Sequence, residues 1–125
     1  MIETALDRIP TPPCAKLLGW RLVDARPQDG WIEIVFDGKE DFCNPAGFIQ
    51  GGILAAMLDD TMGPAVFVMT DGRLYTTTIT MTVNFLAPAK PGRRPTGFMP
   101  RLENLPLALY CCGCGQVPVH FSSTS

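Results

Sequence analysis

Apolar and polar residues alternate most regularly in the segment LYTTTITMTVNFLAP, which begins at Leu74. Its apolar positions are Ile79, Met81, Val83 and Phe85, and its polar positions are Thr76, Thr78, Thr80, Thr82 and Asn84. Because successive side chains of a strand point to opposite faces, the pattern predicts a long strand over Tyr75–Leu86. Pro88 and Pro91 predict where it ends.

A second alternation, in GWIEIVFDG, predicts a strand with Ile32, Ile34 and Phe36 on its apolar face. The stretch Leu17–Ala25 is compatible with a strand that pairs with it as a hairpin. Before that stretch, three prolines in IPTPPC argue against a helix, because proline interrupts helical hydrogen bonding. Only a short helix before Pro10 remains compatible with the sequence there.

From Gln50 to Met62 the apolar residues follow the spacing of a helix. The residues that recur at this spacing are Ile53, Leu54, Met57, Leu58, Thr61 and Met62. The helix is apolar on nearly every side, which predicts that a sheet covers it. Gly63-Pro64 predicts an end or a kink, with a second short helical piece over Ala65–Met69 and a turn at Asp71-Gly72.

Two adjacent carboxylates, Asp59 and Asp60, interrupt this apolar helix. An ionised carboxylate in apolar surroundings costs several kcal/mol unless it has a partner, a raised pKa or a function. Asp60 is expected at a helix edge, in solvent. Asp59 follows Gly51 by eight residues, which returns it to within about a quarter turn of the Gly51-Gly52 side, so it is expected to share a site with the helix N-terminus.

Length and composition indicate one globular domain over residues 1–125. The net charge of −2 and the lack of a basic stripe argue against a nucleic-acid partner. No uncharged apolar stretch reaches the roughly 18 residues of a membrane span, and no secretory signal is recognisable, so we expect a cytoplasmic protein without a membrane partner. The five cysteines are an odd number, and the C-x-x-C at Cys111–Cys114 has only His120 as a nearby nitrogen ligand, so no metal site is predicted.

The segment NPAGFIQGGILAAMLDD carries the arrangement N-P-x-G-x-x-Q-G-G-x-x-x-x-x-L-D, and the Thr-rich strand after it ends in NFLAPAKPG. Together these motifs resemble the hotdog-fold acyl-CoA thioesterases of the phenylacetyl-CoA thioesterase (PaaI-like) type. The resemblance extends from Ala15 to Arg94. It implies an α+β hotdog fold, in which an antiparallel sheet wraps around a central buried helix.

The resemblance also implies roles for individual residues. Gly51 and Gly52 would donate backbone N–H groups to the thioester carbonyl at the helix N-terminus and stabilise the developing oxyanion. Asp59 would act as a general base toward water or as a nucleophile on the acyl carbon. Asn44 would help to orient the site, and Thr78 would hold the attacking water, reaching the site from the partner subunit.

Gln50 stands where many relatives have histidine. Glutamine can hydrogen-bond the thioester carbonyl or the neighbouring backbone but cannot titrate, so mechanisms that need a histidine base are disfavoured. The same reason disfavours a hotdog dehydratase, because His120 is the only histidine and lies outside any matching motif. A non-catalytic acyl-CoA-binding protein or an inactive relic is the main alternative to an enzyme.

Hydrolysis of an acyl-CoA, the implied reaction, requires no metal or redox cofactor. Acyl-CoA is the expected partner, and Lys90, Arg93 and Arg94 are candidates to contact the CoA phosphates. The resemblance further implies a homodimer, or a dimer of dimers, with sites at the interface. The length and aromaticity of the acyl group do not follow from the sequence.

The last 31 residues, Pro95–Ser125, hold two charged residues against twenty in the preceding 94. The strands with which the family continues past PAKPG are not recognisable here, although Leu105–Cys112 is compatible with one buried strand. Codons for Glu103-Asn104-Leu105 or Gly115-Gln116-Val117, read one base later, give family-like fragments. We therefore predict a shifted reading frame over this segment, which would make the chain unstable or prone to aggregation. The alternative is a divergent but functional tail.

Overall fold

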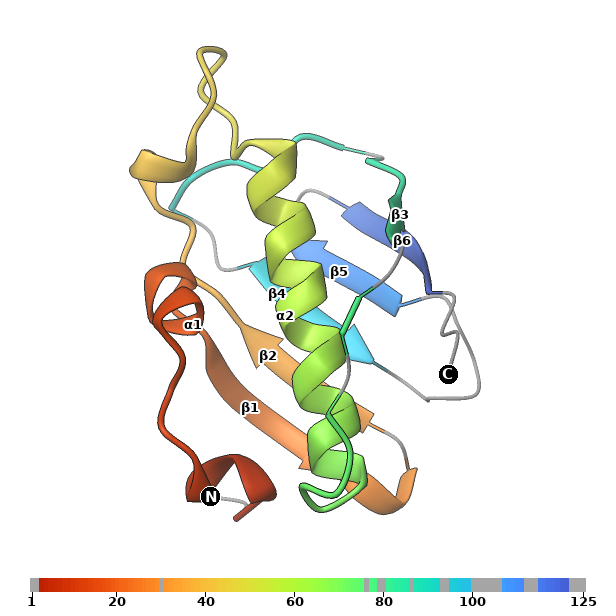
Figure 1. Ribbon diagram of the computed structural model, residues 1–125. Helices are drawn as coiled ribbons and strands as arrows, with labels where there is room; N and C mark the ends of the chain where they lie inside the picture. Colours follow the sequence, from red (N-terminus) through yellow and green to blue (C-terminus); the bar gives the residue numbers. More distant parts are fainter. Residues whose placement is uncertain are drawn as a thin grey trace.

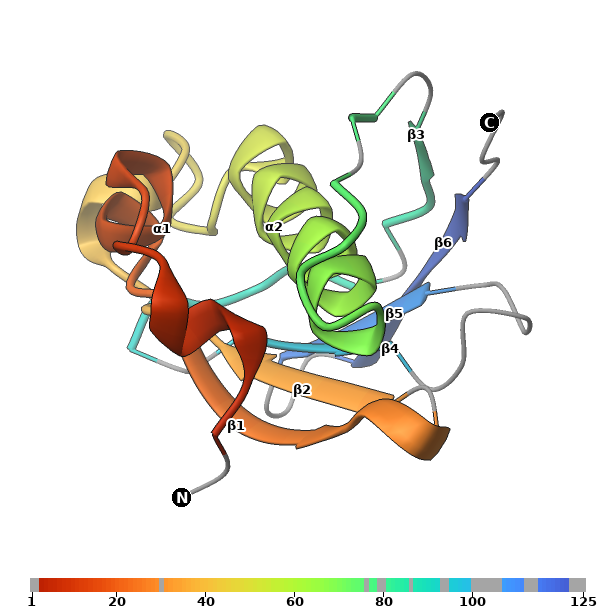
Figure 2. The ribbon, with the colours of Figure 1, turned by 60° about the horizontal axis from the view of Figure 1, so that its bottom comes forward.

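The computed structural model describes residues 3–29, 31–75, 77–78, 81–85, 87–92, 95–99, 107–111 and 115–121. The described strands form one six-stranded sheet in the order β1-β2-β4-β5-β6-β3, with antiparallel neighbours throughout. Helix α2 (Gly51–Met69) lies across one face of this sheet (Figures 1 and 2). The expected α+β arrangement, a sheet curved around a central helix, is therefore confirmed.

The strands are β1 (Arg21–Arg26), β2 (Trp31–Val35), β3 (Met81–Val83), β4 (Pro95–Met99), β5 (Leu107–Cys111) and β6 (Gly115–Phe121). A second α-helix, α1 (Pro13–Leu18), precedes β1. Three short 3₁₀-helices are η1 (Ala5–Arg8), η2 (Pro27–Asp29) and η3 (Glu40–Phe42).

The predicted hairpin is confirmed, with β1 starting at Arg21 rather than at Leu17. In β2, Ile32 and Ile34 are fully buried, as their alternation predicts. The β1–β2 register shifts between Leu22 and Asp24, so Val23 is an extra residue in a β-bulge on the outermost strand of the order.

The prediction that the prolines exclude a helix from the N-terminal segment is wrong, because Leu17 and Leu18 lie in α1. Pro12 is the N-cap and Pro13 the first residue of α1, positions where a helix needs no N–H donor. The helix ends at Gly19, whose φ of 71° is left-handed. The Asp37 side chain packs so closely against Gly19 that a Cβ there would lie 2.2 Å from its carboxyl carbon.

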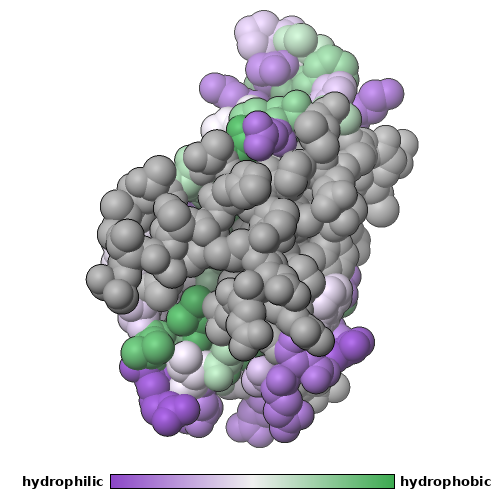
Figure 3. Space-filling model, turned by 90° about the vertical axis from the view of Figure 1, so that its right-hand side faces the viewer, coloured by the Kyte–Doolittle hydropathy of each residue, from purple (hydrophilic) through white to green (hydrophobic). Residues whose placement is uncertain are grey.

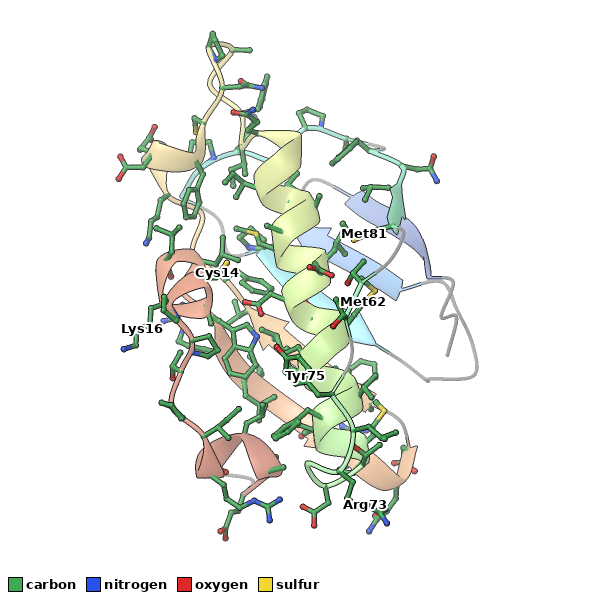
Figure 4. The ribbon with its side chains drawn as sticks, in the orientation of Figure 1. Cys14, Lys16, Met62, Arg73, Tyr75 and Met81 are labelled. Carbon is green, nitrogen blue, oxygen red and sulfur yellow. The ribbon has the colours of Figure 1, made fainter. Side chains whose placement is uncertain are left out.

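Helix α2 supplies the centre of the core. Its buried side chains are Leu54, Met57, Leu58, Thr61, Met62, Ala65, Val66 and Val68. They pack with residues of the β1–β2 hairpin, and Met81 of β3, labelled in Figure 4, packs against the same cluster. By length and composition alone α2 could cross a membrane, but its buried face rests on the sheet, as in the core helix of a globular domain.

Of the two outcomes predicted at Gly63-Pro64, the end of the helix is wrong, because α2 continues through Pro64 and includes the predicted helical stretch Ala65–Met69. Proline has no N–H, so the carbonyl of Asp60, four residues earlier, lacks its helical donor. The indole N–H of Trp20 donates to that carbonyl instead, at 2.9 Å. A side chain from the segment between α1 and β1 thus supplies the hydrogen bond that Pro64 removes.

After α2 the chain turns at Asp71 and Gly72, both with positive φ, and runs back along the helix (Figures 1 and 2). Among the described residues of Tyr75–Leu86, the predicted strand is confirmed only at Met81–Val83, opposite Val119–Phe121 of β6. An alternation of apolar residues predicts which face of an extended segment is buried. A β-strand also needs a neighbouring strand with which its backbone can form hydrogen bonds. Tyr75, labelled in Figure 4, is 88% exposed and pairs with no described strand.

Strands β4, β5 and β6 occupy the segment for which a shifted frame is predicted. The strand expected within Leu105–Cys112 is confirmed as β5. Pro118 of β6 lies opposite Ala108 of β5 and directly precedes Val119–Phe121, the residues that pair with β3. The shifted frame stays a prediction, which the sequence of the coding DNA decides.

The substitution Trp20→Phe should lower the free energy of unfolding by about 1–3 kcal/mol, because it leaves the Asp60 carbonyl without a donor. Chemical denaturation of the purified variants measures this. Pro64→Ala restores a helical N–H for the same carbonyl, so Trp20→Phe should cost less in the Pro64→Ala background. An equal cost in both backgrounds would show that the hydrogen bond contributes nothing.

Candidate functional site

The loop before α2 is built around Asn44. An antiparallel bridge between Cys43 and Ile49 closes the loop. Inside it, the Asn44 side-chain oxygen accepts hydrogen bonds from the backbone N–H groups of Ala46, at 3.0 Å, and Phe48, at 3.1 Å. Asn44 therefore shapes the loop that leads into α2, which agrees with the orienting role that the resemblance implies.

Gly51 and Gly52 form the first turn of α2, as expected. The exposed residue Gln50 is the N-cap, and its side chain makes no capping hydrogen bond. Its carbonyl accepts from the N–H groups of Ile53 and Leu54. No described residue accepts a hydrogen bond from the N–H of Gly51 or of Gly52. Both donors are thus available at the positive end of a 19-residue helix.

A cavity of about 320 Å³ opens beside Gly51, between the loop and the segment after β3. Its lining includes Asn44, Phe48, Leu54 and Phe85. Apolar surface is visible in Figure 3 at the end of the molecule that carries this loop. Sequence reasoning missed Phe85 because its place in the alternating segment assigned it to the core, and no local signal marks it as a cavity residue.

Asp59 is exposed on α2, and its carboxylate accepts a hydrogen bond from the hydroxyl of Thr78, nineteen residues later. The sequence motifs selected these two residues independently, and the fold brings them together. The contact between Thr78 and Asp59 lies within one chain. That Thr78 reaches the helix N-terminus of a partner subunit stays a prediction. The segment that returns along α2 is what carries Thr78 to Asp59 (Figure 1).

Gly51 and Asp59 do not meet in one chain. They are eight residues apart in a continuous helix with a rise of 1.5 Å per residue, so about 12 Å separates them along its axis. The expectation that Asp59 shares a site with its own helix N-terminus is therefore wrong. The expectation came from the rotation of 100° per residue, which places the two residues on nearly the same side of the helix. Being on the same side does not bring them closer along the axis.

The expectation that Asp60 lies in solvent is also wrong. One of its carboxylate oxygens is buried and has no hydrogen-bond partner among the described residues. Burial, with a smaller contribution from the neighbouring charge of Asp59, raises the pKa of Asp60 to about 6. Of the two neighbours, Asp60 turns into the protein and Asp59 turns out of it.

The basic residues proposed for CoA lie after β3. Lys90 is exposed, next to Ala89, which lines the cavity. Arg93 and Arg94 lie outside the described residues, as do Cys112 and Cys114 of the C-x-x-C region.

Comparisons with known proteins agree with this geometry. The model of the thioesterase superfamily matches residues 46–97. No curated protein sequence matches the chain significantly.

Solved structures match over most of the chain. A phenylacetic acid degradation-related protein of Ralstonia eutropha is 26% identical, with a TM-score of 0.75 over 93% of this chain and 92% of that one. The PaaI protein of the Escherichia coli phenylacetic acid degradation operon is 16% identical, with a TM-score of 0.70 over 90% and 86% of the chains. The protein smu.793 of Streptococcus mutans, solved with acetyl-CoA, is 15% identical, with a TM-score of 0.66 over 82% and 84%.

The resemblance seen in the motifs is thus confirmed by the matched family model and by the shared architecture. The chain has the hotdog fold, is similar to the thioesterase superfamily over residues 46–97, and is similar over most of its length to PaaI-like proteins.

Proposed function

We propose that this protein hydrolyses acyl-CoA thioesters to a free acid and CoA, with Asp59 as the catalytic carboxylate. The observation that carries the proposal is the hydrogen bond from Thr78 to Asp59. A hydroxyl beside an exposed carboxylate is an arrangement that can hold and activate a water molecule. The thioesterase family match and the acetyl-CoA bound to the Streptococcus mutans protein support the substrate class.

The proposed reaction begins with the thioester carbonyl against the N–H groups of Gly51 and Gly52. As water adds to the acyl carbon, Asp59 takes its proton, and the helix N-terminus stabilises the negative oxygen. Collapse of this intermediate breaks the C–S bond, and the CoA thiolate takes up a proton. In the alternative course, Asp59 attacks the acyl carbon, the C–S bond breaks, and the CoA thiolate leaves and takes up a proton. Water then hydrolyses the mixed anhydride to the free acid and restores the Asp59 carboxylate.

We further propose that a complete site combines two copies of the chain in a homodimer or a dimer of dimers. The helix N-terminus and Asp59 of one copy are about 12 Å apart along α2, too far to act on one acyl carbon. Gly51 and Gly52 of one copy would therefore face Asp59 and Thr78 of the other. Lys90, Arg93 and Arg94 would contact the CoA phosphates at the rim.

The second candidate function is non-catalytic binding of acyl-CoA. The atypical segment Pro95–Ser125 favours it, because this segment holds only two charged residues against twenty in the preceding 94. A hotdog dehydratase remains the weakest candidate, since Gln50 cannot replace a titrating histidine. Release of CoA thiol by the purified protein, measured over short, medium, long and aryl acyl-CoAs, separates hydrolysis from binding.

The change Asp59→Asn should lower kcat by about 100-fold or more, because the amide cannot accept the proton of water. Asp60→Asn is the matched control: it is the adjacent position, and its side chain turns into the protein, so kcat should change much less. Thiol-release kinetics of both variants, with circular dichroism to confirm folding, measure the contrast. Equal and small effects would contradict the assignment of Asp59.

A site shared between two copies predicts that two inactive variants complement each other. When chains carrying Asp59→Asn and Gly51→Val are co-expressed with different tags, mixed dimers should contain one intact site. About a quarter of the wild-type activity should then return in an equal mixture. The control is a dimer in which both differently tagged chains carry Asp59→Asn. No recovery in purified mixed dimers would contradict the shared site.

The half-buried carboxyl of Asp60 predicts a pH-dependent stability. Its pKa is raised from 3.8 to about 6 in the folded protein, so folding binds a proton between these values, and stability falls as the pH rises through them. Asp60→Asn removes the free-energy cost of ionising this half-buried carboxyl at high pH. The variant should be more stable than the wild type at pH 8 and nearly equal at pH 4, in denaturation curves at both pH values. The exposed Asp41→Asn serves as the control, and an effect of Asp60→Asn that does not vary with pH would contradict the inference.

A further inference from the structure

The side chains that line the cavity beside Gly51 are mostly apolar. Among its lining residues, Asn44 alone has a polar side chain, and its oxygen is already engaged by two loop N–H groups. Leu54 and Ile49 are buried at its base. Gly51, whose N–H has no acceptor among the described residues, also lines the cavity. An apolar group that ends in one hydrogen-bond acceptor, such as an acyl chain with its carbonyl, matches this lining.

Phe85 stands at the boundary of this cavity. A Cβ on Gly51 would lie 3.1 Å from the Phe85 Cζ and 3.3 Å from its Cε1, so the ring edge lies directly against the first residue of α2. The same side chain is 52% exposed. An aromatic ring that is half in water and half against a cavity wall gains free energy when an apolar ligand covers it.

The volume of the cavity limits what it can hold. At about 320 Å³ it is roughly twice the size of the 150 Å³ cavity that binds benzene. It therefore has room for a short or ring-sized acyl group, and a longer chain would have to pass the Phe85 ring.

We propose that Phe85 is the specificity-determining residue of the acyl pocket: its ring, packed on Gly51, limits the length of acyl group whose carbonyl can reach the helix N-terminus. This inference rests on the proposed function, since it assigns the cavity to the acyl part of an acyl-CoA. Shortening the side chain should open the cavity, and enlarging it should close the cavity further.

The experiment compares the wild type with Phe85→Ala and Phe85→Trp on straight-chain acyl-CoAs from two to twelve carbons. Phe85→Ala should raise kcat/KM for the longest substrates relative to the shortest by at least about tenfold, and Phe85→Trp should shift the preference the other way. Phe67→Ala is the matched control, because Phe67 lies near the opposite end of α2, against Gly72. Its chain-length profile should stay parallel to that of the wild type.

Binding of non-hydrolysable S-alkyl-CoA thioethers, measured by calorimetry on the same variants, separates this inference from the proposed function. If the wild type hydrolyses nothing, the proposed function fails, yet a Phe85→Ala shift of thioether affinity toward longer chains still supports the pocket. If Phe85→Ala changes all chain lengths by the same factor in both assays, the inference is overturned. It is also overturned if Phe85→Ala changes only the oligomeric state, because the ring then serves an interface.

Discussion

The burial of α2 is the constraint on which the rest of the structure depends. A helix with eight buried side chains cannot remain in water, so the sheet must curve around it. This covering leaves two parts of the helix accessible. One is the first turn, where the N–H groups of Gly51 and Gly52 have no acceptor among the described residues. The other is the outward side that carries Asp59. The chemistry of the proposed site uses both parts.

Sequence patterns predicted the buried elements well and the exposed segments poorly. Burial requires apolar side chains at every second position of β2 and at helical spacing in α2. Both elements can therefore be predicted from the sequence. The shortness of β3 does not, because pairing depends on a neighbouring strand that no local pattern records. Helix α1 was missed for a different reason, since proline at a helix start is tolerated where proline inside it is not.

The site was predicted in part. The motifs indicated Asp59 and Thr78, which the fold places in contact, and Asn44, which shapes the loop before α2. They did not indicate which of the two aspartates faces solvent, because neighbouring helical positions differ by 100° and the covering elements decide which is buried. The helical continuity through Pro64 also depended on a distant residue, Trp20, forty positions away in the sequence.

The bulge at Val23 gives the two edges of the sheet different properties. A bulge twists an edge strand, and β1 also carries charged residues at Arg21, Asp24 and Arg26, so it is a poor template for another strand. At the other end of the described sheet, β3 is short and carries neither feature. If two copies join through β3, the free edge of each sheet is its β1 strand, where the bulge and the charged residues oppose pairing with another strand. Association then stops at a closed pair instead of continuing into an open fibre.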